Sequence, residues 1–200
     1  MANKLLILKG SPREKGNSAV LADQAAAAAG AAGWQVECVS LQDLDIRACD
    51  GCDLCAQTGE YCVIDDDMQS LYPKLLAADA LVLATPIYWF TFSAQLKLCI
   101  DRWYGLWNAD QHAFQGKRVG IILAYADSDL YTSGGVNAIH TFESMFSYLG
   151  AEIVGVVHGS LSDIGDAERH PALMQEAYEL GSKITADVRP AMPDPDAPEN

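Results

Sequence analysis

Four cysteines lie close together in the middle of the chain, in the order Cys49-x2-Cys52-x2-Cys55-x6-Cys62. Thiolates are ligands for soft metals and react as nucleophiles in redox chemistry. The chain has six cysteines in all, so most of its thiols stand in this one segment. In a reducing compartment, such crowding indicates metal or redox chemistry rather than a framework of disulfides.

A second group of polar residues, GSPREKGNS at positions 10–18, follows the apolar run LLIL at positions 5–8. Ser11, Asn17 and Ser18 can donate hydrogen bonds, and Arg13 has a fork of donors that matches phosphate oxygens. The helix expected after this loop begins with free N–H groups, which attract anions. The spacing fits neither a P-loop nor a G-x-G-x-x-G dinucleotide loop. From these residues alone, a phosphate pocket and a capped turn are both open.

Two further loops carry residues that suit a flat conjugated ligand, TPIYWFTFSA at 85–94 and YADSDLYTSGG at 125–135. Apolar and aromatic side chains bind flat rings, and the first loop supplies Pro86, Ile87, Tyr88 and Trp89. In the second loop, Asp127 and Gly134 are compatible with the polar edges of the same ring. The alternatives are that the aromatic residues cover the end of a sheet or form a subunit contact, and that the second loop is an ordinary turn.

Apolar runs that predict strands alternate with patterns that predict helices along the whole chain. We expect strands at 4–9, 34–40, 80–85, 118–125 and 151–159, and helices at 17–31, 67–77, 93–105, 135–148 and 170–187. Continuous apolar runs are typical of parallel strands that are buried on both faces. The pattern therefore predicts an α/β sandwich of three layers. In such a sheet the three loops meet outside the carboxyl ends of the strands, where ligands bind.

Residues 43–66 form a long connection between the second predicted strand and the second predicted helix, and they include the four clustered cysteines. A connection of this length is usually functional or disordered, and the cysteines favour function. We expect one domain over residues 1–188 with this cysteine-rich loop inserted, followed by a flexible Pro/Asp-rich tail over 189–200. The other two cysteines, Cys38 and Cys99, fall in strand and helix patterns and are expected to be small core residues.

The charge balance excludes one class of partner. The chain has 13 Lys and Arg residues against 27 Asp and Glu residues, a formal net charge of −14. Nucleic-acid phosphates would be repelled because no cluster of basic residues offsets this charge. No segment is long and apolar enough for a membrane span or a signal peptide, so we expect a cytoplasmic protein without a membrane partner.

Three motifs taken together resemble a known family: S-P-R-x-x-G-N-S after the first strand, P-I-Y-W after the third, and the cysteine run that ends in D-D-M. They look like the NADPH-dependent FMN reductase group of the flavodoxin-like superfamily, and within it most like the iron–sulfur flavoproteins. The likeness extends over about residues 4–187. It implies a five-stranded parallel sheet in the flavodoxin order and noncovalently bound FMN. By position, it implies that Ser11, Arg13, Asn17 and Ser18 hold the FMN phosphate, and that Pro86, Ile87, Tyr88 and Trp89 border the isoalloxazine ring.

The resemblance also implies a [4Fe–4S] cluster bound by Cys49, Cys52, Cys55 and Cys62. Their spacing is compatible with one, because two-residue gaps let successive sulfurs converge on a cubane while the fourth ligand comes from slightly farther along. Three alternatives stay open: a zinc site, a redox-active disulfide such as Cys52–Cys55, and no bound group at all.

The expected function follows from the resemblance. Members of the group are commonly dimers or tetramers, accept electrons from NAD(P)H or small redox proteins, and pass them to quinones, nitro compounds or oxygen. We expect an FMN-dependent oxidoreductase with a cluster. The alternatives are a cluster-free NAD(P)H:acceptor FMN reductase, and a flavin- or metal-binding redox sensor or carrier without a substrate. No side chain is expected to be catalytic, since the flavin supplies the chemistry. The acidic surface favours a basic partner such as a ferredoxin-like or cytochrome-like protein.

Overall fold

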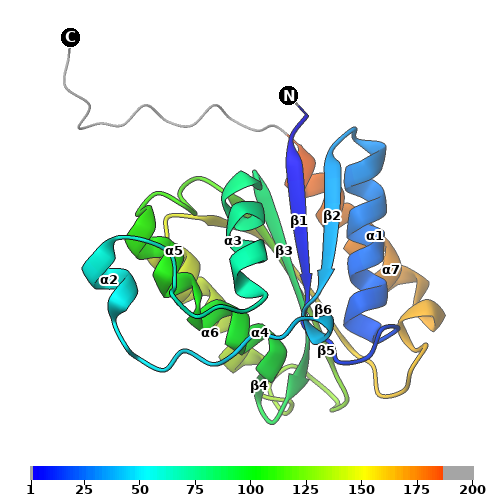
Figure 1. The fold of residues 1–200 in the computed structure, drawn as a ribbon. Coiled ribbons are helices and arrows are strands. Elements are labelled where there is room, and N and C mark those ends of the chain that lie inside the picture. Colours follow the sequence, from blue (N-terminus) through cyan, green and yellow to red (C-terminus); the bar gives the residue numbers. More distant parts are fainter. Residues whose placement is uncertain (1, 187–200) are drawn as a thin grey trace.

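The central sheet contains five parallel strands in the order β2-β1-β3-β5-β6. A computed structural model describes residues 2–186, so the expected tail over 189–200 lies outside the described residues (Figure 1). A short strand, β4, pairs antiparallel with the end of β3. The strands are β1 (Lys4–Lys9), β2 (Gln35–Ser40), β3 (Ala80–Tyr88), β4 (Thr91–Phe92), β5 (Arg118–Tyr125) and β6 (Glu152–Ser160). The predicted five-stranded parallel sheet is therefore confirmed.

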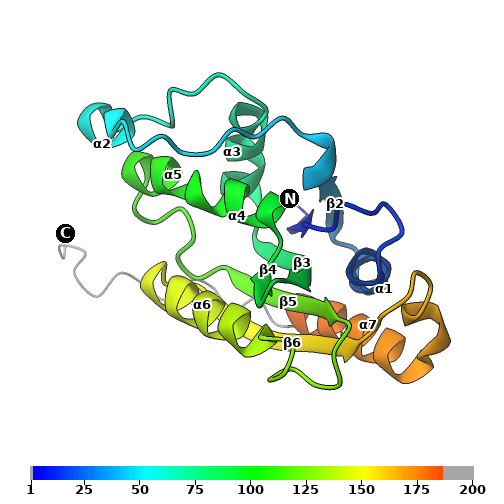
Figure 2. The same cartoon turned by 90° about the horizontal axis from the view of Figure 1, so that it is seen from below.

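Helices cover both faces of the sheet (Figure 1, Figure 2). One face is covered by α1 (Asn17–Ala31) and α7 (Pro171–Thr185). The other face is covered by α3 (Met68–Ala77), α4 (Ala94–Asp101), α5 (Trp103–Ala109) and α6 (Gly135–Tyr148). A short helix, α2 (Leu54–Thr58), stands in the segment that precedes α3, and 3₁₀ turns occur at Leu41–Asp43 and Ala167–Arg169. The predicted three-layer α/β sandwich is confirmed.

The core follows directly from the period of two along each strand. In β1, Leu5 and Ile7 pack towards α1 and α7, whereas Leu6 and Leu8 pack towards α3 and α4. Each of these four side chains is fully or almost fully buried. Burial of a side chain of this size stabilises the fold by about 1.5–3 kcal/mol. A continuous apolar run is therefore what a central parallel strand requires.

The packing of α1 on α7 explains the alanine-rich sequence of α1. Gly181 of α7 lies so close to the backbone of α1 that a Cβ atom there would stand 2.3 Å from the carbonyl oxygen of Ala25. Buried alanines on the facing side of α1 leave room for this approach. The contact fixes the direction of α1, and with it the position of its N-terminus at the carboxyl edge of the sheet. Among residues 2–186, no helix combines the length and the apolar character needed to cross a membrane.

Four sequence predictions differ from the structure. The helix expected over 93–105 is interrupted at Arg102 and continues as α5. The third strand, expected to end at residue 85, continues to Tyr88 and turns into β4. The connection over 43–66 contains α2, a short element that its irregular pattern did not indicate. Finally, Cys38 is exposed because β2 is an edge strand, whereas Cys99 is buried as expected and its burial raises the pKa of its thiol to about 12.

Candidate functional site

The loop between β1 and α1 forms a compact turn that is held by its own backbone. The Oγ of Ser11 accepts a hydrogen bond from the N–H of Arg13 and donates one to its carbonyl, each over 3.1 Å. The N–H of Gly16 also donates to the carbonyl of Arg13, over 3.0 Å. A Cβ atom at Gly16 would stand 2.3 Å from the Oγ of Ser11, so glycine is required there. The turn leads into α1 with Gly16 as the capping residue and no side chain on the cap. The first N–H groups of α1 therefore face outwards, as an anion site needs.

Two adjacent residues at the start of α1 have different roles. The side-chain amide of Asn17 donates to the carbonyl oxygens of Leu161 (3.2 Å) and Asp163 (2.9 Å), and its Oδ1 accepts from the N–H of Ala167 (3.1 Å). Its side chain therefore ties α1 to the segment after β6. Ser18 differs, since its Oγ is buried and has no hydrogen-bond partner within residues 2–186. A buried hydroxyl without a partner is costly, and a phosphate oxygen would satisfy it.

A cavity of about 220 Å³ joins this loop to the end of β3. It lies at the carboxyl ends of the strands, where the α/β fold places ligands. Seven of the residues predicted for the cofactor line it: Ser11, Arg13, Asn17, Ser18, Pro86, Ile87 and Tyr88. The structure therefore brings together the loop over 10–18 and the first part of the loop over 85–94, which are far apart in the sequence.

Three predicted residues do not line this cavity: Trp89, Asp127 and Gly134. Trp89 and Phe90 form the two-residue turn between β3 and β4, and both have positive φ angles, 47° and 69°. The side chain of Trp89 is 91% exposed. Gly134, at the start of α6, supports this turn: a Cβ atom there would stand 2.6 Å from the Cα of Phe90. Asn137 of α6 adds a hydrogen bond from its side-chain amide to the carbonyl of Phe90, over 3.1 Å. Gly134 is thus placed to shape the aromatic turn.

The loop after β5 is ordered by a different acid from the predicted Asp127. Asp127 is exposed, and its main-chain carbonyl accepts a hydrogen bond from the Oγ of Ser160 over 2.5 Å. The carboxylate of Asp129 accepts from the side chain and N–H of Thr132, from the hydroxyl of Ser128 and from the N–H of Tyr131. These hydrogen bonds lower the pKa of Asp129 to about 2. Asp129 therefore fixes the turn that leads into α6.

Among the further residues that line the cavity and that sequence reasoning missed are Tyr125, Leu161 and Ser162. Tyr125 is the last residue of β5, so its position at the carboxyl end of a predicted strand was the signal that could have found it. Its hydroxyl lies 3.0 Å from Nδ1 of His158, and burial raises its pKa. The other two residues follow β6, in a segment without chemical groups that would single it out.

The cysteine-rich loop packs against α5. Cys55 and Cys62 are buried, whereas Cys49 and Cys52 are exposed. A Cβ atom at Gly105 of α5 would stand 2.8 Å from the backbone nitrogen of Cys62, so the absence of a side chain there permits the contact. The side-chain amide of Asn108 donates to the sulfur of Cys55 over 3.7 Å.

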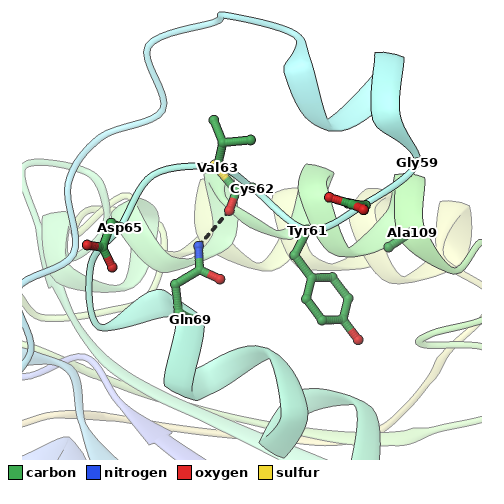
Figure 3. Close-up of a pocket in the computed structure, with 8 residues that line it drawn as sticks. Gly59, Tyr61, Cys62, Val63, Asp65, Gln69 and Ala109 are labelled. Atoms are coloured by element: carbon green, nitrogen blue, oxygen red, sulfur yellow. Dashed lines mark hydrogen bonds between the residues drawn. The ribbon is translucent and has the colours of Figure 1, made fainter.

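A cavity of about 650 Å³ lies beside Cys62 (Figure 3). The Nε2 of Gln69 donates to the carbonyl of Cys62 over 2.5 Å and holds that part of the loop in place. Tyr61 lines the same cavity and stacks on Tyr72, with 5.0 Å between ring centroids. Within the described range 2–186, no three His, Cys, Asp or Glu side chains are gathered as a metal site requires. The four-cysteine ligand set therefore stays a prediction.

A buried ion pair beneath this loop was not foreseen. The guanidinium of Arg102 bonds the carboxylate of Asp66, with Nη1 and Oδ2 2.5 Å apart, and the side chains are 0% and 1% exposed. Burial lowers the pKa of Arg102, but the hydrogen bond to Asp66 and nearby negative groups raise it by more. For Asp66, burial raises the pKa, but the hydrogen bonds from Arg102, Arg47 and Met68 and the positive charge of Arg102 together lower it by more. Both groups therefore stay charged. A lone arginine within an amphipathic helix pattern gave no signal of this role.

The residues present fit the phosphate end of FMN. Ser18, whose hydroxyl has no partner within residues 2–186, lines one cavity together with Arg13 and with Asn17 at the start of α1. Apolar surface from Ile87 and Tyr88 adjoins them. This combination suits a ligand with an anionic end and a flat conjugated end.

Comparisons with known proteins agree with this arrangement. The family model for NADPH-dependent FMN reductases matches residues 3–165. An iron–sulfur flavoprotein of Methanocaldococcus jannaschii is 37% identical over 194 residues, which cover 93% of this chain and 97% of that protein. An iron–sulfur flavoprotein of Archaeoglobus fulgidus is 32% identical over 185 residues, 90% of this chain and 78% of that protein.

A solved structure shows the same fold. The NAD(P)H:quinone oxidoreductase from Methanothermobacter marburgensis superimposes with a TM-score of 0.72 at 16% identity, over 94% of this chain and 99% of that one. The sheet order, the cavity at its carboxyl edge and the match over most of the chain lead to one conclusion. The chain belongs to the NADPH-dependent FMN reductase family.

Proposed function

We propose that this protein is an FMN-dependent oxidoreductase that moves electrons between NAD(P)H, or a redox protein, and a small acceptor such as a quinone or nitro compound. The observation that carries the proposal is the cavity that joins the loop over 10–18 to the end of β3, beside the hydroxyl of Ser18, which has no partner among the described residues 2–186. FMN supplies the hydride and one-electron chemistry when it is bound. The protein supplies binding, orientation and electrostatics.

Each group of residues in and around the cavity has a distinct role in this proposal. Arg13, the hydroxyl of Ser18 and the N-terminus of α1 hold the phosphate, because each is a donor that suits an anion. Ile87 and Tyr88 lie along the ring, where apolar contact excludes water. Gly134 and Asn137 fix the exposed turn at Trp89 and Phe90, so that the aromatic side chains keep one position next to the ring. None of these residues needs to accept or donate a proton.

The proposal includes a [4Fe–4S] cluster held by Cys49, Cys52, Cys55 and Cys62. Two observations support it: four thiols stand in one loop that is anchored on α5, and relatives that are 32–37% identical bear the name iron–sulfur flavoprotein. A cluster of this kind supplies one-electron transfer, at a potential that hydrogen bonds to its sulfurs help to set. The second candidate is a reductase with FMN alone. It is favoured by the arrangement of the described residues, in which no three potential ligands converge.

Anaerobic purification with metal and sulfide analysis separates the two candidates. A cluster gives brown protein with about four irons and four sulfides per chain, whereas FMN alone gives yellow protein without iron. Steady oxidation of NAD(P)H in the presence of a quinone or a nitroarene is expected in both cases. If NAD(P)H is not oxidised, the remaining interpretation is a redox sensor or carrier without a substrate.

Two exposed cysteines offer a matched pair of variants for the same experiment. Cys52→Ser changes an exposed thiol inside the loop, and Cys38→Ser changes an exposed thiol on the edge strand β2. We expect Cys52→Ser to lose iron and to keep FMN, and Cys38→Ser to keep both. Equal iron content in the two variants would count against a cluster in the loop.

A further inference from the structure

The side chain of Arg102 touches both ends of the cysteine-rich loop at once. Its Nη1 donates to the carbonyl of Arg47 over 3.0 Å, and its Nη2 donates to the carbonyl of Ile64 over 3.4 Å. Arg47 stands two positions before Cys49, and Ile64 stands two positions after Cys62. All four cysteines therefore lie between two backbone groups that one buried guanidinium holds together.

Asp66 makes a second connection across the same gap. Its carboxylate accepts the N–H of Arg47 (3.0 Å) and the N–H of Met68 (3.1 Å) in addition to the two bonds from Arg102. In a buried ion pair, additional hydrogen bonds of this kind help to offset the desolvation cost of the carboxylate. The planar fork of a guanidinium can reach several acceptors at once, which the single ammonium of a lysine cannot do. The pair can therefore hold the two ends of the loop together through hydrogen bonds.

The same stretch of chain also contacts two of the cysteines. Arg102, Gly105 and Asn108 recur at intervals of three residues, which places them on one face of a helical segment. Gly105 lies against Cys62, and Asn108 donates to the sulfur of Cys55. One face therefore contacts the ends of the loop, the backbone of Cys62 and the sulfur of Cys55.

We propose that Arg102 is a positioning residue that closes the loop over residues 47–64 and sets the arrangement of its thiols before any group binds. Closing a loop costs conformational entropy. If Arg102 already holds the loop closed, this entropy is not lost when a group binds to the thiols. The inference rests on the proposed function for what the thiols bind. The closure itself belongs to the protein without a metal, so it can be tested separately.

The first test measures how fast the thiols react with an alkylating agent in the FMN-loaded protein freed of metal, with mass spectrometry to assign each cysteine. Two variants are used. Arg102→Lys keeps the charge but cannot span both carbonyls, and Arg102→Met combined with Asp66→Asn removes both buried charges. We expect alkylation of Cys55 and Cys62 to become on the order of tenfold faster in both, because the loop opens when hydrogen bonds to a charged group are lost.

A matched control is available on the preceding helix. Lys97→Ala removes an exposed ion pair with Asp101 on α4, and it should leave the alkylation rates unchanged. FMN affinity is measured in every variant to show that the fold is kept. Unchanged alkylation of Cys55 and Cys62 in folded, FMN-binding variants would overturn the proposal.

The second test asks whether closure matters for binding. The same proteins are treated with ferrous iron and sulfide under anaerobic conditions, and iron and FMN are measured together. We expect both Arg102 variants to retain several times less iron than wild type with FMN unchanged. Faster alkylation with undiminished iron would overturn the positioning role. If the wild type itself takes up no iron, the proposed cluster fails, and the alkylation rates still decide whether Arg102 arranges the thiols.

Discussion

The Oγ of Ser93 donates a hydrogen bond to the carbonyl of Gly10 over 2.6 Å and so joins the N-terminus of α4 to the first residue after β1. The same oxygen accepts the N–H of Leu96, as a helix cap does, and the hydroxyl of Thr85. Ser93 and Thr85 are fully buried. One hydroxyl therefore connects the phosphate loop, the end of β3 and the helix that leads to Arg102.

Replacement of this hydroxyl should weaken the whole fold. We expect Ser93→Ala to lower the free energy of unfolding by about 1–3 kcal/mol, because a helix cap is lost and the carbonyl of Gly10 is left without a partner. Urea denaturation measures the change. Ser70→Ala is the control, since the hydroxyl of Ser70 bonds a backbone carbonyl at an exposed site. It should alter stability by less than about 0.5 kcal/mol.

The loop before α1 allows a direct test of phosphate binding. Arg13 is exposed and lines the cavity, whereas Lys15 is exposed in the same loop and does not line it. We expect Arg13→Ala to weaken FMN binding about tenfold or more, since a hydrogen bond to a charged group contributes about 1.5–3 kcal/mol. Lys15→Ala should weaken it much less. Fluorescence titration with FMN measures both, and equal losses would mean that only the general charge of the loop matters.

Two glycines separate backbone strain from steric contact. Gly134 and Gly165 both have positive φ angles, 75° and 85°. Alanine at either position costs about 1–2 kcal/mol for the backbone conformation alone. At Gly134 the new Cβ would also stand 2.6 Å from Phe90, whereas at Gly165 the neighbouring atoms are 3.6 Å or more away. We therefore expect Gly134→Ala to be the more destabilising and to change the near-UV circular dichroism of the aromatic turn. An equal loss of stability in the two variants would show that the turn at Phe90 moves away from the new Cβ atom without a loss of stability.

The turn after β5 should respond to acid in a specific range. The pKa of Asp129 is about 2, lowered from an ordinary value of 3.8 by its hydrogen bonds from Thr132 and Ser128. A lowered pKa means that the charged carboxylate stabilises the folded turn fully above about pH 4, and that this contribution is lost as the pH falls through about 2. An NMR titration of the Asp129 carboxyl carbon measures it. Thr132→Val removes one donor and should raise the pKa towards 3.8, and titration of the wild type near 3.8 would contradict the assignment.

The sheet and the position of the loop over 10–18 at its carboxyl edge were predictable because local signals decide them. Continuous apolar runs mark strands that helices cover on both faces, and the order of the loops follows from strand direction. The conformation of Trp89 and Phe90 could not be predicted from such local signals. A two-residue hairpin turn with two positive φ angles is normally signalled by Asn-Gly, and here bulky residues take that conformation because Gly134 and Asn137 of α6 hold them.

Long-range pairing is the reason that other features escaped prediction. Arg102 and Asp66 are 36 positions apart, and neither residue type indicates burial by itself. Cys38 was expected in the core because its strand reads as apolar, but the sequence pattern does not show that β2 lies at the edge of the sheet. Asn17 was expected to hold a phosphate, and the sequence did not indicate that its side-chain amide also bonds the segment around Leu161. Each of these outcomes depends on which segments become neighbours.

Asn17 and Ser18 offer the sharpest test of the site because they are adjacent and should respond in opposite ways. Asn17→Ala leaves the carbonyl of Leu161 and the N–H of Ala167 without their partners, whereas the carbonyl of Asp163 keeps the N–H of Asp166. We therefore expect the free energy of unfolding of the FMN-free protein to fall by about 1–3 kcal/mol. Ser18→Ala breaks no hydrogen bond within residues 2–186 and removes a buried hydroxyl that lacks a partner. The FMN-free protein should therefore be as stable as wild type or slightly more stable.

The order reverses when FMN is added. Ser18→Ala removes a donor to the charged phosphate, so FMN affinity should fall about tenfold or more, which corresponds to about 1.5–3 kcal/mol. For Asn17→Ala, affinity per folded molecule should change less, because its amide is already bonded to backbone carbonyls. Denaturation with and without FMN, together with titration, gives all four values. If Ser18→Ala binds FMN as tightly as wild type, its hydroxyl is not a phosphate ligand, and the anion site consists of Arg13 and the N–H groups of α1.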